Sequence, residues 1–499
     1  MIKHSLDSTL KQQAKKKLNK KTSNKSIIYK FNDLTIDISR NLIDMGILKN
    51  LQIFSKSINI KSKINQLFNN EHKSLSENKK VSFLYERFDK NIKKKNFDKL
   101  FEFHDLIKKG NWKSASGKIF KYIVHIGIGG SILGPKATSH ALKDYHDKKI
   151  QIYFASSADT SEIEDILEKC NLTETLFIFA SKSFETREVL INYKYIKDKL
   201  SQFVKKPKDI QKNFLAITAN KNNALKLGIN PKRILIFPKT IPGRFSLSSS
   251  ISFPLLLQIG KNNYNKFING INKIDAHFKN SKVESNIPLM LALISIWNVN
   301  YKNITSNCIL TYNHRLRSFS SFIQQLEMES NGKSVNDLNQ KIDYNTSPFV
   351  FGLQGTECQH SIFQMLHQGT LKTSMDFIGV INTQLEKSTS NFLLSNLIAQ
   401  ADLSFDGKWE SKLYKILNGK NPSTIILLET LNPMNLGALI ALYENKIVAE
   451  GLLWGINSFD QWGVEEGKTV SEKVLKKINS KLKPKNINEI IKVIRRKLD

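Results

Sequence analysis

The sequence has few cysteines and no long hydrophobic run. Only three cysteines, Cys170, Cys308 and Cys358, occur among 499 residues, and they lie far apart. This spacing excludes a disulfide framework and a paired-cysteine metal site, and it is typical of a reducing compartment. The longest apolar stretch, residues 287–299, is too short to cross a bilayer and predicts a buried helix. Because the N-terminus also lacks the apolar region of a signal peptide, we expect a cytoplasmic protein without a membrane partner.

Acidic residues are also scarce relative to basic ones. The chain has 44 Asp and Glu against 76 Lys and Arg, which gives a formal net charge of +32. Such an excess would suit a nucleic-acid-binding protein. The lysines, however, are spread along the whole chain, and the runs at 15–17 and 93–95 have no interleaved aromatic residues to stack on bases. We therefore expect solvated basic surfaces and no specific nucleic-acid partner.

Apolar runs alternate with helical patterns over most of the chain. Residues 1–100 are polar and lysine-rich, with helical patterns at 31–48 and 67–88. Short apolar runs, typical of buried strands, follow at 122–126, 150–155, 176–180, 214–218 and 234–237. After a mostly helical stretch at 248–300, a second set lies at 308–312, 349–352, 377–381 and 424–428. Strands that alternate with helices predict parallel sheets covered on both faces.

The predicted fold class is therefore α/β. We expect two doubly wound αβα sandwich domains with mainly parallel sheets, and helical arms at both ends of the chain. The predicted parts are a helical N-terminal region at 1–100 that packs on the larger domain, a first and smaller domain at 101–255, a second and larger domain at 256–465, and a C-terminal helical arm at 466–499.

A glycine-rich turn follows the strand predicted at 122–126. Residues 127–131 read Gly-Ile-Gly-Gly-Ser, and such a strand-to-helix turn can point backbone N–H groups at an anion. The stretch fails the dinucleotide fingerprint, because Ile132 stands where the third glycine belongs. It also fails the P-loop pattern, because Pro135 stands where lysine belongs. A tight turn without a ligand is the alternative.

Three hydroxyl side chains and one lysine gather in residues 181–186, which read Ser-Lys-Ser-Phe-Glu-Thr. They lie between a predicted strand and a helical pattern at 187–200. Hydroxyl and backbone N–H groups can bind phosphate oxygens, and a lysine adds positive charge. Serine and threonine are also common helix N-caps. From these residues alone, a phosphate site and a capping cluster are equally good interpretations.

Arg244 and two glutamates stand out as single charged residues. Arg244 follows a Pro-Gly turn, where a surface arginine is the usual interpretation. Glu327 and Glu329 lie near the C-terminal end of a helix predicted at 319–330, which an Asn-Gly pair ends. Negative charge is disfavoured at this end of a helix, so a carboxylate here is a candidate proton acceptor. Solvated glutamates are the more common alternative.

Two further stretches carry groups that could react. Residues 355–360 read Gly-Thr-Glu-Cys-Gln-His and predict a helix start with capping-box spacing, which would put His360 and His367 on one helix face. The two histidines have no third ligand at metal spacing, so we expect no metal site. Residues 454–468 are dense in aromatic, amide and charged groups. They predict a loop that either closes over a ligand, with Lys468 as its charge, or is pinned by its two tryptophans.

Together these stretches resemble the phosphoglucose isomerase family. The resemblance covers residues 103–468 and rests on motifs that occur in the family's order at 127–137, 328–333, 359–360 with 367–370, and 457–468. It implies the sugar-isomerase fold, without a metal or another cofactor. It also implies reversible interconversion of D-glucose 6-phosphate and D-fructose 6-phosphate through a cis-enediol(ate), a reaction of glycolysis and gluconeogenesis.

The resemblance also implies roles for single residues. Glu329 would carry a proton between C2 and C1, and Arg244 would stabilise the charge of the enediol(ate). His360, with Lys468 beside it, would open the sugar ring. The implied substrate-binding residues are Gly130, Ser131, Ser181, Lys182, Ser183, Thr186, Gln325 and Gln461. The family's homodimer implies a site at the subunit boundary, with His360 supplied by the partner chain.

The chain departs from the family's pattern at several positions. Ser183 and Glu185 stand where two threonines are usual, and Glu185 would bring a carboxylate near a phosphate dianion unless it faces away. Pro242 replaces a common glycine, and residues 155–161 differ from the usual stretch. These departures bear on substrate affinity more than on the reaction. The rival interpretation is a non-catalytic regulator of the same fold that binds sugar phosphates, and the complete set of acid–base residues argues against it.

Overall fold

The computed structural model describes residues 4–15, 26–74, 76–479 and 488–498. The chain divides into two compact units, Met1–Ser458 and Phe459–Asp499. The first unit contains both large sheets, and the described part of the second contains α18 (Trp462–Ile478) and α19 (Glu489–Leu498). Of the described helices, none is both long enough and apolar enough to cross a membrane.

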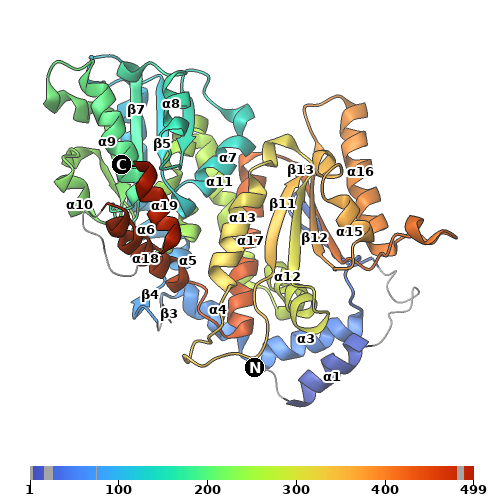
Figure 1. Ribbon diagram of the computed structural model, residues 1–499. Helices are drawn as coiled ribbons and strands as arrows, with labels where there is room; N and C mark the ends of the chain where they lie inside the picture. Colours follow the sequence, from blue (N-terminus) through green and yellow to red (C-terminus); the bar gives the residue numbers. More distant parts are fainter. Residues whose placement is uncertain (1–3, 16–25, 75, 480–487, 499) are drawn as a thin grey trace. The chain divides into compact units, whose positions relative to one another are not determined.

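The first sheet is entirely parallel and confirms the first set of predicted strands (Figure 1). It consists of β5 (Tyr122–Ile126), β6 (Gln151–Ala155), β7 (Thr175–Ala180), β8 (Phe214–Thr218) and β9 (Ile234–Ile236), in the order β6-β5-β7-β8-β9. From β5 the chain steps outward to β6 and then returns past β5 to β7. The winding direction therefore reverses beside the carboxyl ends of β5 and β7, which is where open α/β sheets bind their ligands.

The second sheet is mixed, and it confirms the second set of predicted strands. Four parallel strands form its main part: β10 (Ser306–Thr311), β11 (Phe349–Gln354), β12 (Ser374–Asn382) and β13 (Ser423–Thr430). The whole order is β1-β2-β13-β12-β10-β11. The α/β class with mainly parallel sheets is thus confirmed, while the predicted domain boundaries stay a prediction.

The N-terminal region contributes two strands that the sequence analysis missed. β1 (Ile28–Phe31) and β2 (Leu34–Asp37) form a hairpin, and β2 pairs antiparallel with β13. The helix predicted at 31–48 is therefore wrong, because the helical part begins only with α3 (Met45–Ser57). Along β2, buried and half-buried residues alternate, which is the pattern of a strand that lies on a sheet.

The helix predicted at 67–88 is also wrong over most of its length. The segment contains only the end of α4 (Ile60–Phe68), a two-stranded hairpin of β3 (Lys73–Ser74) and β4 (Lys79–Lys80), and α5 (Phe83–Phe88). Asn70 and Asn78 have positive φ angles of 59° and 52°, which interrupt the helical path on either side of β3. Asparagine adopts this conformation more readily than most residues.

Further helices of the described chain complete the first unit. They are α1 (His4–Lys15), α6 (Lys90–Lys108), α7 (Leu133–Ala141), α8 (Ser161–Leu167), α9 (Arg187–Ser201), α10 (Lys221–Lys226), α12 (Ile287–Ile296), α13 (Phe319–Asn331), α14 (Gly355–Cys358), α15 (Phe363–Gln368) and α16 (Lys387–Asp406). α12 is buried at nearly every position, so the buried helix predicted from residues 287–299 is confirmed.

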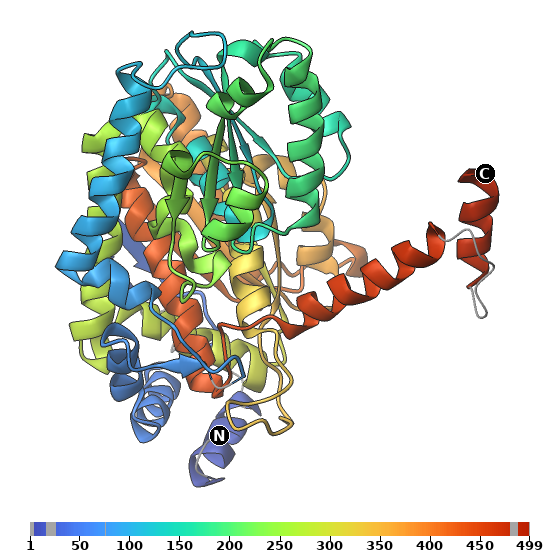
Figure 2. The same cartoon turned by 90° about the vertical axis from the view of Figure 1, so that its left-hand side faces the viewer.

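Two long helices, α11 (Phe253–Asn280) and α17 (Pro433–Trp454), run side by side between the two sheets (Figures 1 and 2). Their backbones touch, because a Cβ atom on Gly437 would lie 2.0 Å from the carbonyl oxygen of Phe267. A Cβ atom on Gly270 would lie 1.9 Å from the carbonyl oxygen of Met434. Glycine at both positions thus sets how closely these helices pack.

The stretch at 454–468, predicted as a loop, is only partly a loop. α17 ends at Trp454, and Gly455 follows it with a φ of 67°, the left-handed conformation common after helices. Residues 462–468 are already the first turns of α18, so the loop prediction is wrong for this half. The described residues of α18 and α19 are helical, as predicted for the C-terminal arm.

Gly437→Ala should lower the free energy of unfolding by about 1–3 kcal/mol, because the new methyl group must push the Phe267 backbone away. Urea unfolding followed by circular dichroism measures this change. Gly467→Ala is the matched control: it lies in α18 with no neighbour within 4 Å of the new Cβ atom. The free energy of unfolding of the control should rise by up to about 1 kcal/mol, because alanine has the higher helix propensity. Equal effects of the two substitutions would contradict the packing role of Gly437.

Candidate active site

The glycine turn after β5 packs closely against two other segments. Gly129 has a φ of 54°, a conformation that glycine adopts without strain. A Cβ atom at Gly129 would lie 2.8 Å from Nε2 of Gln325 on α13. A Cβ atom at Gly130 would lie 2.3 Å from the carbonyl group of Gly243. The turn, which also carries Ser131, is therefore fitted against α13 and against the backbone that leads into Arg244.

A buried histidine holds the end of this turn. His125 lies on β5, and its Nε2 donates a hydrogen bond of 2.7 Å to the carbonyl oxygen of Ser131. The carbonyl can only accept, so Nε2 carries the proton. Burial lowers the pKa of His125 to about 4, and the ring is therefore neutral near pH 7.

The hydroxyl-rich loop at 181–186 follows β7, the neighbour of β5. The hydroxyl groups of Ser181 and Thr186 are hydrogen-bonded at 2.8 Å, and Ser181 Oγ also accepts from the backbone N–H of Phe184 at 3.1 Å. Thr186 occupies the N-cap position of α9, but its side chain makes no capping hydrogen bond. The Thr186 side chain therefore does not cap α9, and the phosphate site stays a prediction.

The charged residues of the same loop point to different partners. Lys182 Nζ donates to the carbonyl oxygen of Ile241 at 3.0 Å, and partial burial lowers the pKa of this lysine. Ser183 Oγ accepts from the backbone N–H of Glu185 at 3.2 Å. The Glu185 carboxylate accepts a hydrogen bond of 2.9 Å from Asn223 on α10. Glu185 is thus hydrogen-bonded to a neighbouring helix, whereas Lys182 reaches the segment before Arg244.

Arg244 is buried, so the surface interpretation of this residue is wrong. Its side chain is 0% exposed, and Nη1 lies 3.2 Å from Oε1 of Glu329. Nε donates to the hydroxyl of Ser330 at 2.7 Å, and Nη2 donates to the carbonyl oxygen of Ser458 at 2.6 Å. A buried guanidinium needs such partners on all its edges, because an unpaired buried charge is strongly unfavourable.

Glu329 lies between Arg244 and Gln325. Gln325 and Glu329 are four residues apart on α13 and therefore share one helix face. Gln325 Nε2 donates to Oε2 of Glu329 at 2.7 Å, while Oε1 faces Arg244. The Glu329 side chain is 17% exposed, so one carboxylate is held by two donors and still reaches the surface of the first unit.

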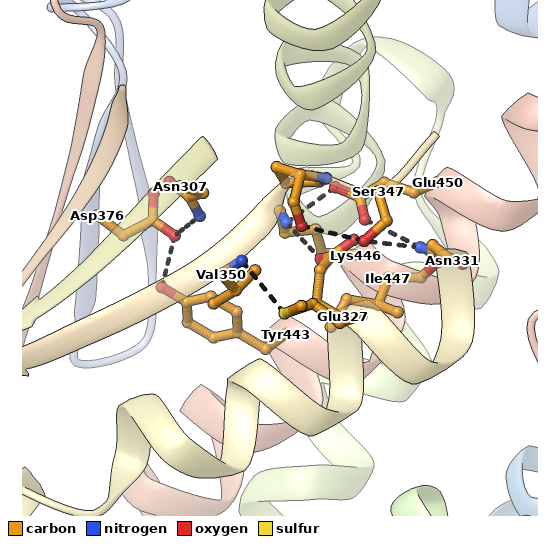
Figure 3. A network of polar contacts seen from close by, with 12 residues as sticks. Asn307, Glu327, Asn331, Ser347, Val350, Asp376, Tyr443, Lys446, Ile447 and Glu450 are labelled. Atoms are coloured by element: carbon orange, nitrogen blue, oxygen red, sulfur yellow. Dashed lines mark hydrogen bonds and ion pairs between the residues drawn. The ribbon is translucent and has the colours of Figure 1, made fainter. Parts of the chain in front are cut away.

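Glu327 differs from Glu329 in its burial and in its partner, and the solvated interpretation is wrong for it. Its side chain is 1% exposed and lies 3.1 Å from Nζ of Lys446 on α17. Figure 3 shows Glu327 beside Asn331, Lys446 and Glu450, which lie in the interior. α13 therefore presents one carboxylate to the candidate site and the other to the interior.

His360 lies in a break between two helices. The predicted continuous helix is wrong, because α14 ends at Cys358 and α15 begins only at Phe363. The predicted capping box is also absent from this described segment, since the Gln359 side chain donates to the hydroxyl of Tyr312 at 3.1 Å. His360 is exposed, whereas His367 on α15 is half-buried, 3.2 Å from the hydroxyl of Ser404.

Gln461 and Lys468 belong to the second unit. Lys468 is exposed on α18, where its Nζ lies 2.9 Å from Oε1 of Glu465. Gln461 Nε2 is 3.5 Å from the same oxygen atom. Of the predicted site residues, the structure thus joins Gly130, Arg244, Gln325 and Glu329 directly, and it joins Ser181 with Thr186.

Comparison with known proteins identifies the family of this chain. A family model described as phosphoglucose isomerase matches residues 37–491. The chain belongs to the phosphoglucose isomerase family. A glucose-6-phosphate isomerase of Campylobacter jejuni subsp. doylei is 34% identical to it, over 89% of this chain and 87% of the relative.

Other relatives agree with this membership of the phosphoglucose isomerase family. A glucose-6-phosphate isomerase of Buchnera aphidicola subsp. Schizaphis graminum is 37% identical, over 91% of this chain and 87% of the relative. The crystal structure of a glucose-6-phosphate isomerase from Chlamydia trachomatis D/UW-3/Cx matches with a TM-score of 0.87 and 26% sequence identity, over 99% of this chain and 98% of that chain. Sequence and fold therefore agree over nearly the full length.

The sequence analysis missed several residues that hold the candidate site together. Ser330 and the carbonyl of Ser458 bind Arg244, and His125 binds the turn that carries Ser131. Ser330 lies inside the 328–333 motif and Ser458 inside the 457–468 motif, so these motifs could have pointed to both residues. Their contacts with Arg244 left no sign in the sequence, because Arg244 and Ser458 are 214 residues apart.

No metal centre is found in the part of the chain that the structure describes: no group of three or more His, Cys, Asp or Glu side chains could hold an ion. The three cysteines are free thiols. Burial raises the pKa of Cys170 to about 11 and that of Cys358 to about 12, so these thiols stay protonated near pH 7.

His125 should make the stability of the protein depend on pH. Its folded pKa of about 4 lies below the ordinary value of 6.5, so the unfolded chain binds a proton first as the pH falls. This contribution is complete above pH 6.5 and is lost between about pH 6.5 and 4, by up to about 3 kcal/mol. His125→Gln keeps a donor for Ser131 but cannot titrate, so its unfolding free energy should fall less steeply with acid. The unfolding free energies of the wild type and of His125→Gln are measured by urea titration at several pH values from 4.5 to 7.5. An equal dependence on pH in the two proteins would contradict this role.

Proposed function

We propose that this chain is a glucose-6-phosphate isomerase, which interconverts D-glucose 6-phosphate and D-fructose 6-phosphate. The observation that carries this proposal is the contact between buried Arg244 and partly exposed Glu329, beside the Gly130 turn, in a chain of the phosphoglucose isomerase family. A carboxylate paired with a fixed cation can take a proton from carbon and have the resulting negative charge stabilised nearby. Family membership favours this function over a non-catalytic regulator.

The phosphate group of the substrate is proposed to bind at the carboxyl ends of β5 and β7. Gly130 and Ser131 would supply backbone and hydroxyl donors from the turn after β5. Ser181, Ser183 and Thr186 would supply hydroxyl groups, and Lys182 the positive charge. The contact of Glu185 with Asn223 supports this proposal, because it gives the carboxylate that departs from the family pattern a partner of its own.

Glu329 is proposed to carry a proton between C2 and C1 of the open-chain sugar. The same carboxylate must reach both carbons and return what it took, so its position has to be fixed. Hydrogen bonding to Gln325 and pairing with Arg244 support this role. Arg244 would stabilise the enediol(ate), and this fixed charge is why we expect no metal or other cofactor.

Ring opening is proposed to use His360 and Lys468, with Gln461 lining the site. We propose a homodimer with active sites at the subunit boundary, to which each chain supplies His360 for its partner. The exposure of His360 in the break after α14 supports a role toward another chain. The free cysteines are in keeping with action in the reducing cytoplasm.

Ser181→Ala combined with Thr186→Ala should raise KM for the 6-phosphate sugar. Each lost hydrogen bond to a charged group costs about 1.5–3 kcal/mol. The increase in KM is measured in a coupled assay, with Ser201→Ala at the end of α9 as the matched serine control. If the double variant has the KM of the wild type, these hydroxyl groups have a purely structural role.

Glu329→Gln should abolish most of the isomerase activity and leave sugar-phosphate binding largely intact. The amide keeps the shape of the side chain but cannot accept the proton, and a positioned base contributes about 10²–10⁴-fold to the rate. The wild type must first convert fructose 6-phosphate in the coupled assay. Glu429→Gln, an exposed carboxylate at the end of β13, is the control and should keep full activity. Normal turnover by Glu329→Gln would exclude this residue as the base.

Mixed dimers test whether His360 acts across the subunit boundary. His360→Ala and Glu329→Gln chains, unfolded together and refolded, should form about half mixed dimers. Each mixed dimer would contain one site with both lesions and one intact site, so the activity should recover to roughly a quarter of wild type. No recovery, with subunit exchange confirmed by mass spectrometry, would place both residues in the site of one chain.

A further inference from the structure

A chain of hydrogen bonds connects Arg244 to the interior through Ser458 and Asn331. The carbonyl oxygen of Ser458 accepts from Arg244 Nη2 at 2.6 Å. The hydroxyl of the same serine donates to Oδ1 of Asn331 at 2.7 Å. Ser458 and Asn331 are both buried. The residue that accepts from the arginine is therefore itself held by the last residue of α13.

The Asn331 side chain is fixed in one orientation. Its Nδ2 donates to Oε1 of Glu327 at 3.3 Å, to Oε2 of Glu450 at 3.2 Å and to the carbonyl oxygen of Ile447 at 3.0 Å (Figure 3). The carbonyl oxygen of Ile447 can only accept, so the amide nitrogen must face it. The amide oxygen is then left for Ser458, whose hydroxyl donates. A flipped amide would put its oxygen atom against the Ile447 carbonyl oxygen.

The two acidic side chains that accept from Asn331 both pair with one lysine. Lys446 Nζ lies 3.1 Å from Glu327 and 2.8 Å from Glu450, and all three side chains are at most 9% exposed. Burial and the neighbouring charge of Glu327 raise the pKa of Glu450. This buried cluster of two acidic side chains and one lysine anchors the Asn331 amide between α13 and α17.

A glycine on α17 makes room for Ser458. A Cβ atom at Gly451 would lie 1.8 Å from the Ser458 hydroxyl oxygen and 3.1 Å from Oδ1 of Asn331. Alanine is otherwise the better residue for a helix. Glycine at this position therefore lets the serine lie directly on the helix, within reach of Asn331.

We propose that Asn331 and Ser458 are positioning residues for Arg244: they fix the carbonyl oxygen that holds Nη2 and thereby aim the guanidinium at the reacting carbons. The inference rests on the proposed function, in which Arg244 stabilises the enediol(ate). It also explains why the 328–333 and 457–468 motifs occur together, because Asn331 and Ser458 join them. A misplaced guanidinium should weaken the transition state more than the bound substrate.

Ser458→Ala in the full-length protein tests this inference. It removes the hydroxyl but leaves the backbone carbonyl, so kcat should fall about tenfold or more while KM changes by less than about twofold. Tyr344→Phe is the matched control, because the Tyr344 hydroxyl binds the carbonyl oxygen of Trp454 in the same stretch at 2.7 Å. The control should keep kcat even if both variants unfold at lower temperature. Unchanged kcat in Ser458→Ala would overturn the proposal.

Two further variants separate positioning from a general loss of structure. Gly451→Ala should displace the Ser458 hydroxyl without removing any polar group and should reproduce the fall in kcat, so it tests the proposal even if Ser458→Ala does not fold. In an Arg244→Lys background, Ser458→Ala should lower kcat by no more than about twofold, because both changes act on one interaction. Independent, multiplicative losses would overturn the proposal. A wild type without isomerase activity would instead refute the proposed function.

Discussion

The site depends on the pairing of Arg244 with Glu329, because a fully buried guanidinium is stable only with partners on every edge. The carboxylate, the Ser330 hydroxyl and the Ser458 carbonyl provide them. In the proposed reaction, Glu329 loses its negative charge when it takes a proton from the sugar, and the enediol(ate) gains that charge. Arg244 then faces the same total charge at a slightly different place. A fixed cation therefore serves both the resting site and the intermediate without rearrangement.

In the proposed site the two sheets would contribute different parts. The first sheet would provide backbone and hydroxyl groups, at the turns after β5 and β7, where the winding direction reverses. The second sheet would provide α13, which follows β10 and carries Gln325 and Glu329. The glycine turn after β5 contacts α13 at Gln325, and it also packs on Gly243. Side chains larger than hydrogen at Gly129 or Gly130 would separate the proposed phosphate site from the proposed base.

The sequence predicted the repeating architecture well and the burial of single charges poorly. Runs such as 122–126 and 214–218 coincide with strands, because a strand buried on both faces is apolar throughout. The β1–β2 hairpin was missed, since four residues that alternate between buried and half-buried give a short signal. Glu327 looked solvated because its partner Lys446 is 119 residues away, and only the fold brings the two together. The candidate site residues were predicted from family motifs, whereas the contacts that support them required the structure.

The C-terminal end of α13 shows how the fold accommodates charges that the helix disfavours. Two glutamates lie in its last turns, where the helix dipole is negative. Each has its own cation from a distant segment: Arg244 for Glu329 and Lys446 for Glu327. Lys333 adds a third, because its Nζ donates to the carbonyl oxygens of Glu329 and Ser330 at 2.8 Å each. The helix end is thus held by three positive charges from different directions, and a carboxylate at such a point can gain and lose a proton while its backbone stays in place.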